Sequence, residues 1–135
     1  MMERMTTHAT STFDIDTWQD EPYDEAEGAN LRRAHLTKTF HGDVEGRSTV
    51  EMLMAQAQDE SAAYVAFERL DVRVHGRAGT FVLQHSGSGT RDRRTATWTV
   101  VPDSGTGELR RLRGTAQIVI GPDGGHAFEL DYDLD

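Results

Sequence analysis

Two glycine-rich segments, set among residues that alternate between apolar and polar, constrain this fold more than any other feature of the sequence. The first, residues 76–87, is typical of a tight turn that leads into a strand. The second, residues 104–114, is typical of a constrained loop with a short helical turn between two strands. Together they favour a small antiparallel β-barrel with an enclosed lumen.

Period-two alternation of apolar residues predicts eight strands, at residues 13–18, 31–40, 49–56, 62–74, 79–85, 95–101, 114–120 and 126–134. Residues 49–56 also contain good helix formers, but a strand fits their neighbours better. Sequential strands with turn signals between them predict one all-β domain, a single antiparallel eight-stranded meander β-barrel. We expect residues 1–11 to be a disordered tail, residues 12–135 to form the barrel, and the acidic residues 19–30 to be a loop over its mouth.

Composition excludes several functional classes. The chain has 135 residues and no cysteine, so disulfides and thiolate metal sites are absent. Its net charge of −9 argues against nucleic acid and anionic membranes as partners. The sequence has no long apolar run, no signal-peptide pattern and no His-X-His or His-Glu-X-X-His motif, so we expect a cytoplasmic protein without a metal or cofactor. The basic residues 91–94 and 110–113 are either solvated loop charge or an anion site at the barrel mouth.

The first glycine-rich turn predicts a specific pair of polar residues inside the barrel. With Gly76 and Arg77 as the central residues of a two-residue loop, Glu68 faces His85 on the apolar side of the hairpin. Tyr64 lies on the same side, four residues before Glu68. A partly desolvated carboxylate beside an imidazole can act as a general acid or base. The same pair can equally be two buried polar groups that satisfy each other.

A second hairpin, around residues 121–125, pairs Ile120 with His126 and Ile118 with Phe128. This register turns Phe128 and Tyr132 toward the lumen. The predicted ligand contacts are the large apolar and aromatic residues of this face, Phe81, Leu83, Trp98, Phe128 and Tyr132. Packed against one another, the same residues would instead form a solid core.

Four segments carry a resemblance to a known family: residues 40–46, 64–69, 76–85 and 100–109. From about Phe13 to Leu134 the chain resembles DUF3224, a bacterial family of unknown function. The resemblance implies an allene oxide cyclase-like barrel. It implies no activity and no catalytic residue.

These observations leave two functional hypotheses. In the first, the protein is a cofactor-free isomerase or cyclase that acts on an apolar small molecule in the lumen, where Glu68 and His85 move protons and Tyr64 orients the substrate. In the second, it is a non-catalytic barrel that binds a small molecule or another protein. Val65, Phe67 and Val82 face outward, which leaves a homo-oligomer, either a dimer or a trimer, as a further expectation.

Overall fold

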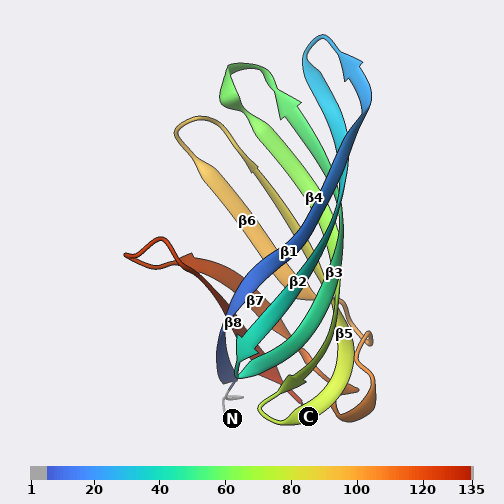
Figure 1. Ribbon diagram of the computed structural model, residues 1–135, viewed down its shortest axis with the longest axis vertical. Coiled ribbons are helices and arrows are strands. Elements are labelled where there is room, and N and C mark those ends of the chain that lie inside the picture. The colour runs from blue at the N-terminus through green and yellow to red at the C-terminus, as the bar shows by residue number, and fades with distance from the viewer. Residues whose placement is uncertain (1–5, 135) are drawn as a thin grey trace, which may run out of the picture.

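The protein folds as a closed barrel of eight antiparallel strands, each paired with its neighbours in sequence. The computed structural model describes residues 6–134 and is shown in Figure 1. The strands are β1 (Thr7–Ala26), β2 (Ala29–Gly42), β3 (Val44–Ala57), β4 (Ala62–Val74), β5 (Arg77–Gly89), β6 (Arg94–Val100), β7 (Arg113–Ile120) and β8 (His126–Asp133). Two short 3₁₀ turns, Gln58–Glu60 and Gly107–Leu109, are the only helical elements within residues 6–134. The predicted meander barrel is confirmed, as is the strand assignment of residues 49–56.

The barrel has two halves that differ in closure. In the closed half, residues 7–12 of β1 pair with β8, and β7 pairs with β6 through Trp98–Ala116 and Thr99–Thr115. In the open half, β1–β6 extend beyond β7 and β8 as a curved sheet, which includes residues 18–26 of β1 and 62–66 of β4. Figure 1 shows the β7–β8 hairpin turning away while the other strands continue upward.

The closed half is filled by its own side chains. Its core contains large residues with essentially no exposed surface, among them Phe40, Leu70, Phe81, Leu83, Phe128 and Leu130. Leu109 and Leu112, from the connection between β6 and β7, complete this core. At this level the lumen is therefore packed with the side chains of described residues.

The second glycine-rich segment packs on the first. The backbone N–H of Thr106 donates to the carbonyl of Thr80 at 2.8 Å, and the N–H of Thr80 donates to Oγ1 of Thr106 at 3.0 Å. A methyl group added to Gly79 would lie 2.1 Å from the carbonyl oxygen of Thr106, so only glycine permits this approach. The predicted short helical turn is present at Gly107–Leu109.

The predicted turn of the β4–β5 hairpin is displaced by one residue. His75 and Gly76, not Gly76 and Arg77, are its central residues, with φ of 48° and 82°. Positive φ at both positions is the pattern of a type I′ turn, and histidine is among the residues that tolerate it. Val74 consequently pairs with Arg77, and Glu68 faces Leu83 instead of His85. Because the partner shifts by two residues, both side chains remain on the inner face.

The N-terminal boundary also differs from the prediction. β1 starts at Thr7, and Ala9 and Ser11 are buried where they pair with β8. The part of the expected tail that falls on residues 1–5 lies outside the described residues. The expected acidic loop at 19–30 is instead the long end of β1 and its turn into β2. Pro22 is accommodated there because this part of β1 is an edge strand, where a missing N–H breaks no second ladder.

Candidate functional site

A pocket of about 390 Å³ lies in the open half. Its lining is mostly apolar and small: Met52, Met54, Ala55, Gln56, Ala62, Ala63, Tyr64, Gly87, Ser88, Gly89, Arg94, Thr95 and Ala96. These residues all belong to strands β3, β4, β5 and β6. The volume lies within the range found for small-molecule sites, which are also lined mostly by apolar residues.

Two glycines on the inner face of β5 make room for the larger side chains of the pocket. A methyl group on Gly87 would lie 2.7 Å from Cε1 of Tyr64, and one on Gly89 would lie 2.8 Å from Cγ of Arg94. Gly87 and Gly89 do not have positive φ, so space, not backbone conformation, explains them. The Tyr64 ring and the Arg94 stem thus lie flat across the strand.

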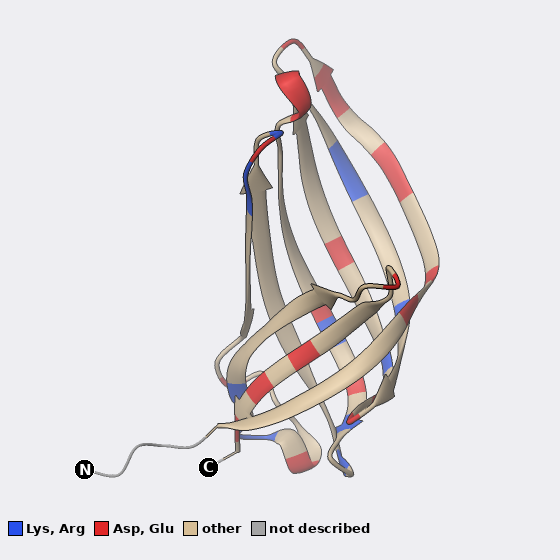
Figure 2. Cartoon of the chain, turned by 90° about the vertical axis from the view of Figure 1, so that its left-hand side faces the viewer, with Lys and Arg blue, Asp and Glu red and all other residues tan. Residues whose placement is uncertain are grey.

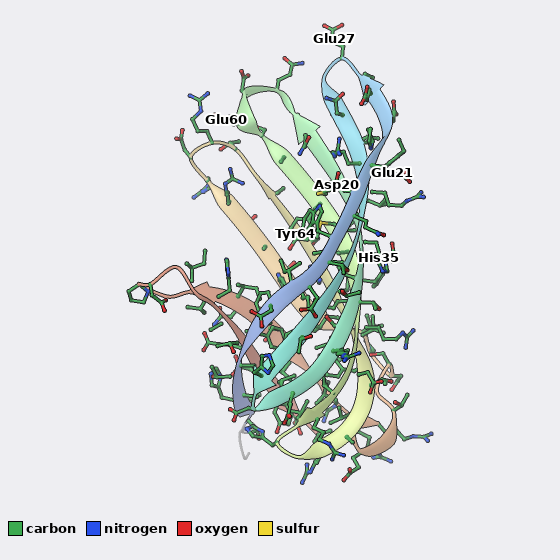
Figure 3. The ribbon with its side chains drawn as sticks, in the orientation of Figure 1. Asp20, Glu21, Glu27, His35, Glu60 and Tyr64 are labelled. Carbon is green, nitrogen blue, oxygen red and sulfur yellow. The ribbon has the colours of Figure 1, made fainter. Side chains whose placement is uncertain are left out.

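Tyr64 forms the lower wall of the pocket. Figure 3 shows it near mid-height, well below the strand tips that carry Glu27 and Glu60. Its ring is half-buried and meets the ring of His85 edge-on, with centroids 5.8 Å apart. Burial raises the pKa of the Tyr64 phenol, the contact with Trp98 offsets part of this, and the charge of Glu68 raises the pKa further. Tyr64 is therefore a neutral phenol at neutral pH.

Beneath Tyr64 lies a buried polar cluster centred on Glu68, which is completely inaccessible to solvent. Ser48 donates a hydrogen bond to Oε2 of Glu68 at 2.6 Å, and Nζ of Lys38 lies 3.4 Å from Oε1. Nε2 of His85 lies 3.3 Å from the same Oε1, close enough for an ion pair but without good hydrogen-bond geometry. The predicted Glu68–His85 proximity is thus present, diagonally across β4 and β5.

The cluster keeps Glu68 ionised. Burial alone would raise the pKa of this carboxyl, but contact with His85, the charge of Lys38 and the Ser48 hydrogen bond together outweigh burial and lower the pKa. Lys38 supplies the compensating positive charge, and its Nζ also lies 4.9 Å from the ring centroid of Phe13 and 5.4 Å from that of Trp98. A carboxylate held this way accepts hydrogen bonds and does not donate a proton.

His85 is enclosed by aromatic rings. Its imidazole stacks on Trp98 with centroids 3.9 Å apart and planes 9° apart. Nδ1 of His85 is buried and has no hydrogen-bond partner among residues 6–134. An unpartnered buried nitrogen is uncommon in a folded protein, which singles out this side of the imidazole.

Comparison with known proteins settles the family. The family model described as "Protein of unknown function (DUF3224)" matches residues 9–132. The chain belongs to the DUF3224 family. It is also similar to the crystal structure of a DUF3224 protein of unknown function from Shewanella oneidensis MR-1, with 39% sequence identity and a TM-score of 0.84. That match covers 96% of this chain and 98% of the other. No curated protein matches the sequence.

In this DUF3224 protein the predicted site residues fall into two groups. Glu68, His85, Tyr64 and Trp98 come together at the boundary between the two halves. The other predicted ligand contacts, Phe81, Leu83, Phe128 and Tyr132, lie in the filled core and do not line the pocket. The Tyr132 hydroxyl instead contacts Nδ1 of His75 at 2.5 Å.

Sequence reasoning missed Lys38 and Ser48. A signal for Lys38 exists, because it occupies the apolar face of β2 between Leu36 and Phe40, and it is the chain's single lysine. Ser48 likewise continues the buried alternation of β3, two residues before Val50. A charged residue on an apolar face indicates a buried partner of opposite charge.

Two further kinds of feature are absent from residues 6–134. No group of three or more His, Asp or Glu side chains there is arranged to hold a metal ion. No helix in that range is long and apolar enough to cross a membrane.

Proposed function

We propose that this protein binds an apolar small molecule in the pocket of the open half. The observation that carries the proposal is the pocket itself, about 390 Å³ of mostly apolar space lined by residues of β3 to β6. Large side chains at these positions would have packed the open half as they pack the closed half. The small residues leave apolar surface that an apolar ligand would cover.

The buried cluster supports this function by holding the pocket's lower wall. Glu68 is ionised, inaccessible and absent from the pocket lining, so it is a positioning group for His85. His85 in turn contacts Tyr64, which does line the pocket. Polar contacts of this kind fix ring orientations that packing alone would leave free.

A fluorescent apolar probe tests the binding proposal. N-phenyl-1-naphthylamine should bind the wild-type protein, and Ala96→Phe should weaken binding about tenfold because the new ring fills the pocket. Thr97→Phe is the matched control, since Thr97 is exposed and absent from the pocket lining. Equal binding by both variants, or no binding by the wild type, would contradict the proposal.

A cofactor-free isomerase is the second candidate, and the unpartnered Nδ1 of His85 is the observation that favours it. In this alternative the phenol of Tyr64, which lines the pocket, exchanges a proton with the bound molecule, His85 contacts the Tyr64 ring from beneath, and Glu68 orients the imidazole. The test is to incubate the protein with a ligand that binds and to look for an isomer of unchanged mass. His85→Gln should abolish conversion and retain binding, whereas unchanged conversion would exclude this candidate.

A further inference from the structure

We infer that the ligand of this pocket carries an anionic group, such as a carboxylate, and that Arg94 pairs with it at the pocket rim. The inference rests on the proposed binding function and adds the chemical class of the ligand. Of the described residues that line the pocket, Arg94 is the single one with a charged side chain. The remaining lining is apolar or neutral, so an anionic group has one position of strong attraction.

The position of Arg94 is built into the strand pair. Arg94 faces Gly89 across β5 and β6, and a methyl group on Gly89 would lie 3.0 Å from Cα of Arg94 and 2.8 Å from its Cγ. The glycine therefore lets the apolar stem of Arg94 cross the inner face of β5. Arg94 thereby belongs to the residues that line the pocket, although its side chain is also exposed to solvent.

Arg94 has no carboxylate partner among residues 6–134, unlike another arginine of the same turn. Arg91 donates to Glu60 at 2.9 Å, so its charge is already paired. Arg93 contributes to a different hollow, between the ends of β3, β4 and β5, and not to this pocket. Only one of the three arginines thus offers an unpaired charge to the pocket.

The positive charge of Arg94 is opposite in sign to the net charge of the protein. The chain carries a net charge of −9, and Figure 2 shows acidic residues spaced along the open half of β1. Asp20, on that strand, is itself paired with Arg32. A long-range field of this sign would repel an anion, so binding of an anionic ligand needs a local cation at the site. A guanidinium fits carboxylate, sulfonate and phosphate oxygens in a two-pronged geometry.

Two probes of matched shape separate the charge from the apolar contact. N-phenyl-1-naphthylamine is neutral, and 8-anilinonaphthalene-1-sulfonate adds one sulfonate to the same ring system. We expect the wild type to bind the anionic probe more tightly, and Arg94→Gln to lose about tenfold for that probe while binding the neutral probe unchanged. Arg93→Gln is the matched control and should change neither affinity. In competition against the neutral probe, decanoate should displace it at lower concentration than 1-decanol.

The possible outcomes separate the role of Arg94 from the binding function of the pocket. Equal affinity of the wild type for both probes, or an Arg94→Gln variant that still prefers the anion, overturns the role of Arg94 and leaves the apolar pocket in place. Failure of the wild type to bind either probe overturns the binding function and this inference with it. Loss of both probes in Arg94→Gln, with the far-ultraviolet circular dichroism unchanged, shows that Arg94 shapes the pocket and does not select charge, which also overturns the inference.

Discussion

Strands β1–β6 run through both the closed and the open half of the barrel, and along β5 the two halves differ in the size of the side chains that point inward. Along β5, Phe81 and Leu83 fill the closed half, while Gly87 and Gly89 contribute no side chain to the open half and accommodate Tyr64 and Arg94. β4 shows the same change, because Leu70 is buried in the core and Ala66 lies below the pocket. One strand pattern therefore supplies both a core and a site, and residue volume decides which of the two forms.

The polar cluster marks the boundary between these halves. Along β4, Glu68 lies between the core residue Leu70 and the pocket residue Tyr64, and along β5, His85 lies between Leu83 and Gly87. The contacts of Glu68 with Lys38 and Ser48 make a buried polar layer tolerable at that level. The comparison predicts that substitutions below this layer affect stability and that substitutions above it affect binding.

Truncating the closed core should have the largest effect. Phe128→Ala removes a fully buried ring and should lower the free energy of unfolding by about 3–5 kcal/mol, measured by urea denaturation. Met54→Ala, in the half-buried wall of the pocket, should cost about 1 kcal/mol, because part of its surface already faces water. Similar losses for the two variants would contradict the division into a core half and a site half.

Removing the charge of Glu68 should be nearly as costly. Glu68→Gln leaves Lys38 buried without its counter-charge, and breaking a buried ion pair costs about 3–5 kcal/mol. The control is Glu51→Gln, since Glu51 pairs with His35 on the exposed surface and should contribute less than about 1 kcal/mol. The pKa of Glu68 is lower in the folded state than its ordinary value of 4.5. Its stabilising contribution is therefore present above pH 4.5 and is lost as the pH falls through the folded-state pKa. Glu68→Gln should therefore flatten the acid side of the stability profile, and an unchanged acid limb would exclude this role.

A methyl group added to a glycine of β5 should mainly reduce stability in the closed half and mainly reduce binding in the open half. Gly79→Ala presses against the backbone of Thr106 and should destabilise the fold by about 1–3 kcal/mol in thermal or urea unfolding. Gly87→Ala presses mainly on the movable Tyr64 ring, so it should cost less stability and should weaken binding of the naphthylamine probe. If Gly79→Ala weakened binding with stability intact, the comparison would be reversed.

The smallest effect should come from the exposed contacts that join β1 and β8. A hydrogen bond to Asp131 raises the pKa of His8, desolvation offsets part of this increase, and the charges of Asp131 and Glu129 raise the pKa further. The pKa of His8 is higher in the folded state than its ordinary value of 6.5. The stability that His8 contributes is therefore fully present below pH 6.5 and is lost as the pH rises through the folded-state pKa. As the pH rises above 6.5, the melting temperature of the wild type should therefore fall slightly more than that of His8→Gln. Parallel pH profiles would show that His8 does not contribute to closure.

Much of this fold could be predicted because turns and alternation determine a meander. The β7–β8 register came out correctly, with Ile120 opposite His126, since the Pro-Asp-Gly-Gly turn leaves few alternatives. The predicted β4–β5 register was wrong by two residues. The prediction placed the left-handed residue of the turn at Gly76, whereas His75 adopts a left-handed conformation as well, so the turn begins one residue earlier. The inner face survived the error, since side chains alternate with a period of two.

The candidate site could be predicted only in part. Alternation identified Glu68, His85 and Tyr64 as inward residues, and all three meet. Alternation shows which residues face inward but not how far along the barrel axis they lie. Phe81 and Phe128 were therefore predicted to contact a ligand, whereas they lie in the core of the closed half. How far β1 extends beyond β8 is a property of the whole barrel, and it decides which inward residues face a pocket.

The pairing of Thr7 with Tyr132 has a consequence for how the chain is connected. The first and last described strands are neighbours, and every other neighbouring pair is consecutive in sequence. The order of the strands thus forms a ring in which no strand is topologically first. A circular permutant, joined across the present ends by a short flexible linker and opened at the exposed β1–β2 turn beside Gly28, would preserve every strand pairing, so the identity of the first strand is interchangeable in this architecture.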